Sequence, residues 1–218
     1  MIDDIVRMRR TIEHDVFDYH TLTEALRTYR KPRDKFTKLL ERGAVVRIKK
    51  GLYIFGADFR REPISREYLA NLIYGPSYVS LDYALSYHGL IPERVDLVTS
   101  VTMKRSKEFH TPFGVFSYRM VTNNRYSIGA VLEQAGKVSF LIASPEKALI
   151  DKVWTDKRFH GTSIFEYKTY LTEDLRIDFE ALKNLNITRA QSIVRKYDSA
   201  KINNLLQFVM RQRTSSDA

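Results

Sequence analysis

The chain of 218 residues is long enough for one large domain or two small ones, and its 44% apolar content is sufficient for hydrophobic cores. The absence of cysteine excludes disulfides, thiolate catalysis and cysteine-based zinc fingers. There is no long uncharged apolar run, and the first ten residues lack the apolar segment of a signal peptide. We therefore expect a cytoplasmic protein without a membrane span.

Basic charge is concentrated at the two ends of the chain. The formal net charge is +10, with +6 in residues 1–61, −1 in residues 62–182 and +6 in residues 183–213. Ten basic and two acidic residues fall within residues 27–50 alone. Two separate basic ends predict either a long nucleic-acid footprint or two different acidic partners.

Two amphipathic helices are expected before residue 30. In the first, Ile5, Met8 and Ile12 recur at the spacing of one helical face, and arginines at positions 7, 9 and 10 lie off that face. The second is expected to begin at Thr21, because Thr21-Leu22-Thr23-Glu24 fits a capping box. In this motif the threonine and glutamate side chains satisfy each other's backbone amides.

A third helix, over residues 32–42, is expected to carry much of the basic charge. Pro32 suits its first position because the missing N–H would have no partner there, and Gly43 suits the left-handed turn that ends it. Phe36, Leu39 and Leu40 form its apolar face. At about 100° per residue, a stripe of cations follows a different face, namely Lys31, Lys35, Lys38 and Arg42.

A basic β-hairpin is expected after this helix, with strands at residues 45–48 and 52–55 and a turn that contains Gly51. A basic helix followed by a basic hairpin is typical of a winged helix-turn-helix, whose recognition helix enters the major groove. The alternative interpretation is a charged helix and hairpin that are merely solvated. The candidate DNA-binding residues are Lys31, Arg33, Lys35, Lys38, Arg42, Arg47, Lys49 and Lys50.

A domain boundary is expected within residues 56–64, which have no hydrophobic period and contain both glycine and proline. The expected domains are residues 1–58 and 64–218. The fold class expected is α+β, with an N-terminal winged helix-turn-helix followed by a mixed α/β domain that has antiparallel strands and a helical C-terminus.

Within the second domain, helices are expected after Ser65, Ser80 and Ser144, with all three serines acting as N-caps. A β pattern covers residues 95–121, and a hairpin joins residues 128–132 to 138–143. Residues 179–212 are expected to be helical.

Three blocks of this sequence together resemble one protein family. They are LLERG at 39–43 continued by RIKKGLY at 47–53, then YVSLDYALSYHGL at 78–90, then SPEKALID at 144–151. In this order, over about residues 15–155, they resemble the AbiEi-type antitoxins of type IV toxin–antitoxin systems, which act in abortive infection and phage defence.

The resemblance implies an N-terminal winged helix-turn-helix that represses the protein's own operon and a C-terminal domain needed for antitoxicity. It implies two partners, the operator DNA and a neighbouring nucleotidyltransferase-like toxin. Residues 31–42 would be the recognition helix and residues 47–53 the wing. The alternative function is a protein-interaction module that neutralises the toxin by direct binding, with the basic segment 183–213 contacting it.

The third hypothesis is that the protein is an enzyme, and no sequence motif favours it. The five histidines are scattered, and no P-loop, GxGxxG or GxSxG pattern occurs. Glu146 and Asp151 lie beside lysines, but their spacing suits a helix start rather than a metal-dependent nuclease. We therefore expect no catalytic residue, metal or cofactor, and we interpret His88 as a hydrogen-bonded structural residue.

Overall fold

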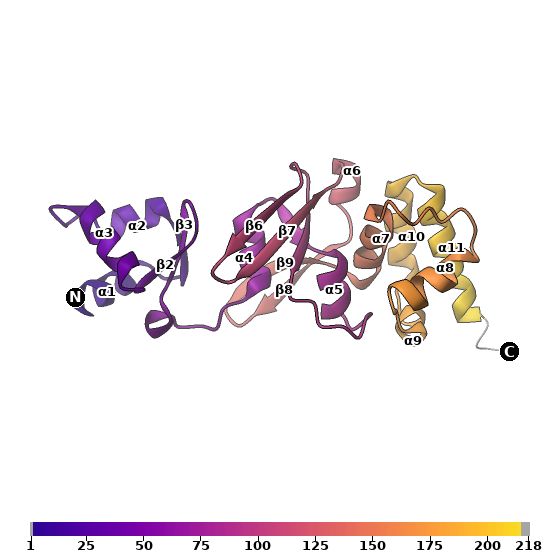
Figure 1. The fold of residues 1–218 in the computed structure, drawn as a ribbon, viewed down its shortest axis with the longest axis horizontal. Coiled ribbons are helices and arrows are strands. Elements are labelled where there is room, and N and C mark those ends of the chain that lie inside the picture. Colours follow the sequence, from indigo (N-terminus) through magenta and orange to yellow (C-terminus); the bar gives the residue numbers. More distant parts are fainter. Residues whose placement is uncertain (1, 215–218) are drawn as a thin grey trace. The chain divides into compact units, whose positions relative to one another are not determined.

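The computed structural model describes residues 2–214 and is an α+β fold (Figure 1). The chain divides into two compact units. The N-terminal unit comprises residues 1–65 with 111–113, and the C-terminal unit comprises residues 66–110 with 114–218.

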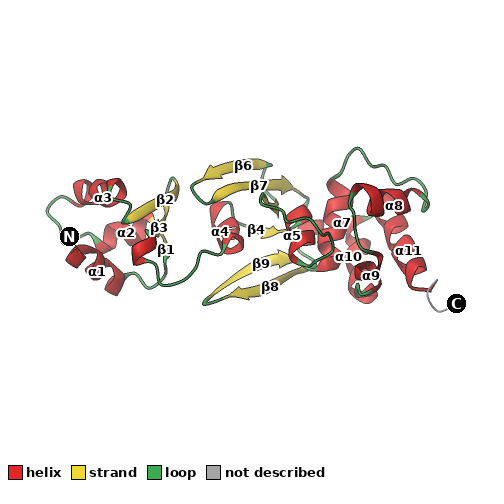
Figure 2. Cartoon of the chain, turned by 60° about the horizontal axis from the view of Figure 1, so that its bottom comes forward, coloured by secondary structure: helices red, strands yellow, loops and turns green. Residues whose placement is uncertain are grey.

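The N-terminal unit places three helices beside a small antiparallel sheet of strand order β1-β3-β2 (Figure 2). The register pairs Phe17 with Tyr53 and Val46 with Ile54. Its elements are α1 (Ile2–Thr11), β1 (Val16–Asp18), α2 (Tyr19–Ala25), α3 (Pro32–Glu41), β2 (Val45–Lys49), β3 (Leu52–Phe55) and the short 3-10 helix η1 (Ala57–Phe59).

The expected apolar face of α1 is confirmed, but one of its arginines is not on the surface. Ile5, Met8 and Ile12 are buried in the core of the unit, and so is Arg9. The Arg9 guanidinium lies 2.9 Å from the Asp15 carboxylate and 4.3 Å from the centre of the Phe55 ring. These contacts account for the buried position, which helical spacing alone does not predict.

The predicted start of the second helix is wrong. Helix α2 begins at Tyr19, and the carboxylate of Asp18 caps it by accepting a hydrogen bond of 2.7 Å from the Thr21 amide. This bond lowers the pKa of Asp18. Thr21 therefore lies inside the helix, because strand β1, which was not predicted, delivers Asp18 to the capping position three residues earlier.

Replacing Asp18 with alanine is expected to destabilise α2 by about 1 kcal/mol, because the Thr21 amide loses its acceptor. Asp18→Asn keeps an acceptor oxygen and is the matched control. Hydrogen exchange of the α2 amides measures the difference. Equal protection in the two variants would mean that the cap does not stabilise the helix.

Helix α3 and the hairpin form where they were predicted. Pro32 occupies the first turn of α3, and Gly43 follows it with a φ of 68°. Strands β2 and β3 pair antiparallel around Gly51, whose φ is 86°. A positive φ is strained for residues with a side chain, so glycine suits both turns.

The C-terminal unit is built on a six-stranded mixed sheet of order β6-β7-β5-β4-β9-β8. Its strands are β4 (Ser77–Val79), β5 (Val98–Thr102), β6 (Lys107–Thr111), β7 (Gly114–Met120), β8 (Ala130–Ala135) and β9 (Val138–Ala143). The pairs β4–β5 and β8–β9 are antiparallel, whereas β4–β9 and β5–β7 are parallel. The antiparallel strands that were predicted therefore make up only part of the sheet.

The predicted helices of this unit are present. They are α4 (Arg66–Ile73), α5 (Leu81–Tyr87), α7 (Pro145–Thr155), α9 (Phe179–Lys183), α10 (Ile187–Tyr197) and α11 (Ala200–Thr214). Three short helical segments were not predicted: α6 (Asn123–Tyr126), α8 (Glu166–Thr169) and η2 (Tyr170–Asp174). Among residues 2–214, no helix has the length and apolarity needed to cross a membrane.

Of the three predicted serine caps, the one at Ser144 is correct, the one at Ser80 is wrong, and the one at Ser65 stays a prediction. The Ser144 hydroxyl accepts a 3.3 Å hydrogen bond from the Lys147 amide at the start of α7. Ser80 stands at the N-cap position of α5, but its side chain makes no capping bond. Its hydroxyl donates instead to the Asp151 carboxylate at 2.8 Å.

Candidate nucleic-acid interface

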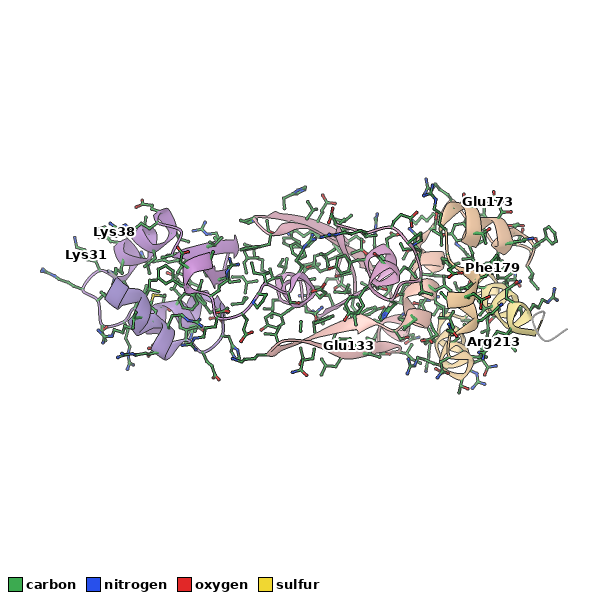
Figure 3. The ribbon with its side chains drawn as sticks, turned by 90° about the horizontal axis from the view of Figure 1, so that it is seen from below. Lys31, Lys38, Glu133, Glu173, Phe179 and Arg213 are labelled. Carbon is green, nitrogen blue, oxygen red and sulfur yellow. The ribbon has the colours of Figure 1, made fainter. Side chains whose placement is uncertain are left out.

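The predicted DNA-binding residues lie on α3, its N-terminal boundary and the β2–β3 hairpin, all within the N-terminal unit. Lys35 and Lys49 are half-buried, and the other six are exposed. Figure 3 shows Lys31 and Lys38 at the surface of this unit. The exposed six are Lys31, Arg33, Lys38, Arg42, Arg47 and Lys50.

The outward face of α3 is not purely basic. Leu39 is buried against the core, and Asp34 and Glu41 lie roughly 140° and 160° around the helix from it. Both carboxylates are therefore near the middle of the exposed face. The Lys31 ammonium lies 4.0 Å from the Asp34 carboxylate, so part of the basic charge is locally compensated.

The cationic stripe follows one flank of α3, at the border of the core. Lys35, Lys38 and Arg42 line a pocket of about 230 Å³ together with buried apolar residues and with Asp58 and Phe59 of η1. The ammonium of Lys35 also lies 5.1 Å from the centre of the Tyr29 ring. Of the three, Lys38 and Arg42 are the exposed cations on this flank.

The hairpin presents its cations beside a turn that is hydrogen-bonded to α2. The Tyr19 amide donates to the Gly51 carbonyl at 3.2 Å, which ties the turn to the start of α2. Arg47 lies over the Tyr53 ring at 5.9 Å, and Lys50 is exposed at the turn. The register shift between Arg47 and Lys49 is a local irregularity of β2.

Neutralising the two α3 carboxylates is expected to strengthen binding to random-sequence duplex DNA. Asp34→Asn with Glu41→Gln removes the repulsion between two carboxylates and the phosphates. Each charge removed is worth about 1 kcal/mol, which is about fivefold in affinity for each. Fluorescence anisotropy at low salt measures the change. Replacing Glu13 and Glu62 in the same way controls for net charge, and equal effects of the two pairs would mean that the α3 face does not meet the DNA.

No protein-family model matches this chain, and no curated protein matches it. Its function is therefore inferred from its own residues and their geometry.

The C-terminal unit contains a buried polar cluster that the sequence did not reveal. Lys147 and Asp151, one helical turn apart on α7, form an ion pair of 2.9 Å with both side chains fully buried. The Asp151 carboxylate also accepts hydrogen bonds from Tyr78 at 2.9 Å and from Ser80 at 2.8 Å. The helix start predicted here is present, with Glu146 in the first turn of α7, but the burial of Lys147 and Asp151 was not predicted.

Helices α6 and α10 complete this cluster. The Lys147 ammonium donates to the Arg125 carbonyl at 2.7 Å and to the Tyr197 hydroxyl, which in turn donates to Asp151. Burial raises the pKa of the Tyr197 hydroxyl, and Asp151 raises it further. Burial also lowers the pKa of Lys147, although Asp151 opposes this. The cluster is thus satisfied internally, which is the condition for tolerating buried charge.

A cleft of about 670 Å³ in this unit is lined by residues of α5, α7 and η2 and of the adjoining loops. Several of its polar groups contact one another: Lys152 lies 2.6 Å from Asp82, and the Tyr170 hydroxyl donates to Asp156 at 3.2 Å. Among the described residues, no group of three or more His, Asp or Glu side chains is arranged to hold a metal ion. His88 has a 2.7 Å hydrogen bond to the Ala143 carbonyl, as expected for a structural histidine.

Proposed function

We propose that this protein is a DNA-binding transcriptional autorepressor and the antitoxin of a type IV toxin–antitoxin system. The observation that carries the proposal is the basic α3 followed by the basic β2–β3 hairpin. The order helix, strand, helix, helix, strand, strand in the N-terminal unit supports the assignment of a winged helix-turn-helix. In this assignment α3 is the recognition helix and the hairpin is the wing.

The three blocks that resemble AbiEi-type antitoxins support the second half of the proposal. The first block covers the end of α3 and the hairpin. The second block supplies Tyr78 and Ser80, and the third supplies Lys147 and Asp151. The second and third blocks therefore meet in the buried cluster, which gives a physical reason for their occurrence in one chain.

A reporter placed behind the chain's own upstream region tests the regulatory function. The protein supplied in trans is expected to reduce reporter expression, and the Lys38→Ala, Lys50→Ala variant is expected to restore it. Co-expression with the product of the neighbouring gene tests antitoxicity. Unchanged reporter expression with wild-type protein would contradict autorepression.

A further inference from the structure

Three segments after residue 65 contain basic residues and no acidic ones. They are residues 97–107, 109–132 and 181–197, and only Glu108 interrupts the first two. The Glu108 carboxylate lies 2.9 Å from the His110 ring. Such long acid-free stretches stand out in a chain with 26 acidic residues.

The fold brings the basic parts of these segments together. The loop between β5 and β6 is joined to the end of β7, because the Met120 amide donates to the Ser106 hydroxyl at 3.0 Å. The chain then enters α6, which contacts α10 (Figure 1). Arg125 of α6 donates to the Tyr197 carbonyl at 2.8 Å, at the end of α10.

The cations along this path are exposed. We define the C-terminal basic surface as Lys104, Arg105, Lys107, Arg119, Arg195 and Lys196, all of which are exposed. Lys104 and Lys107 are partly engaged, since their ammonium groups lie 5.3 Å and 4.9 Å from the centres of the Tyr74 and Phe109 rings. The Lys104 ammonium also donates to the Gly75 carbonyl. Asp198 is the nearest acidic residue in the sequence to the α10 cations.

Neutral hydrogen-bond donors accompany these cations. On α10, Thr188 lies within roughly 20° of Arg195 around the helix, and both are exposed. Asn123 and Asn124 are exposed on α6. Arginine, lysine, hydroxyl and amide groups are the side chains that contact phosphate and sugar in protein–nucleic acid complexes.

We propose that the C-terminal basic surface binds the phosphate backbone of a nucleic acid without reading its sequence. This inference goes beyond the proposed operator recognition, because it concerns a different unit and needs no base contacts. Counterion release from the nucleic acid supplies the driving force, so the binding is expected to fall steeply with salt.

An acidic protein, such as the toxin, is the competing occupant. Protein interfaces usually have an apolar core surrounded by polar residues. Here the exposed apolar side chains beside the cations are Met103 and Met120, which are 40% and 54% exposed. Two methionines among six cations favour a polyanion over a folded protein surface.

A charge-matched pair of full-length variants tests the proposal. Arg105→Ala, Arg119→Ala, Lys196→Ala removes three charges from the C-terminal basic surface. Lys137→Ala, Lys157→Ala, Lys168→Ala removes three exposed charges elsewhere in the same unit. Binding to a non-operator DNA duplex and to an RNA duplex of equal length is measured by anisotropy across a salt series.

The surface variant is expected to bind at least roughly tenfold more weakly at 0.1 M salt, with a salt slope lower by about two to three. The control variant is expected to bind nearly as wild type does. If the surface variant binds only the DNA duplex or only the RNA duplex more weakly, that nucleic acid is the one that the C-terminal basic surface binds.

Three results would overturn the proposal: equal loss in both variants, no measurable binding of wild type to either duplex, or loss of binding only to an acidic polypeptide such as polyglutamate. Operator discrimination is measured separately with Lys38→Ala, Lys50→Ala. Failure of one proposal therefore leaves the other intact.

Discussion

Replacing Asp151 with alanine is expected to lower the free energy of unfolding of the C-terminal unit by about 3–5 kcal/mol. The substitution leaves the Lys147 ammonium buried without its counter-charge and deprives Tyr78 and Ser80 of their acceptor. Denaturant unfolding followed by tryptophan fluorescence measures the loss. Trp154 is the only tryptophan of the chain and lies against Arg125 and Tyr197, so its emission reports this unit.

Two controls separate buried charge from charge in general. Asp82→Ala removes the ion pair with Lys152, whose partners are partly exposed, and is expected to cost less than about 1 kcal/mol. Lys147→Met with Asp151→Leu removes both buried charges and is expected to recover part of the lost stability, because Tyr78 and Ser80 still lack their acceptor. If Asp151→Ala cost no more than Asp82→Ala, the cluster would not stabilise the fold.

Removing one exposed cation from α3 and one from the hairpin is expected to weaken operator binding and flatten its salt dependence. For Lys38→Ala with Lys50→Ala, the slope of log affinity against log salt should fall by about two, one for each phosphate contact. Affinity at 0.1 M salt should fall by about tenfold or more. Anisotropy titration with the upstream DNA of the chain's own gene measures both quantities.

The matched control for this experiment is Lys157→Ala with Lys168→Ala, which removes the same charge from exposed positions in the C-terminal unit. It should leave the operator slope within about half a unit of wild type. If the two variants behaved alike, α3 and the hairpin would not be the assigned interface.

The sequence predicts best where local chemistry decides the structure. Pro32, Gly43 and Gly51 mark helix and turn boundaries through their own backbone preferences, and α3 and the hairpin form accordingly. The start of α2 was mispredicted because Asp18 and Thr21 both suit an N-cap. The choice between them depends on a three-residue strand too short to show alternation.

Features that depend on distant residues could not be predicted in this way. Lys147 and Asp151 have the spacing of an ordinary surface ion pair, and nothing near them shows that Tyr197 covers them. The parallel pairing of β5 with β7 could not be predicted either, because the alternation of apolar residues along a strand does not show which strand it pairs with. The acid-free segments can be recognised in the sequence, but only the structure shows that their basic parts lie close together.

The most direct test of the central claim is a comparison of two duplexes of equal length, the chain's own upstream DNA and a scrambled version, titrated with the purified protein across a salt series. The account predicts a preference of several hundredfold or more for the upstream DNA that persists at moderate salt, as for a specific regulator. Equal and steeply salt-dependent binding to both duplexes would contradict operator recognition and leave only non-specific binding by basic surfaces.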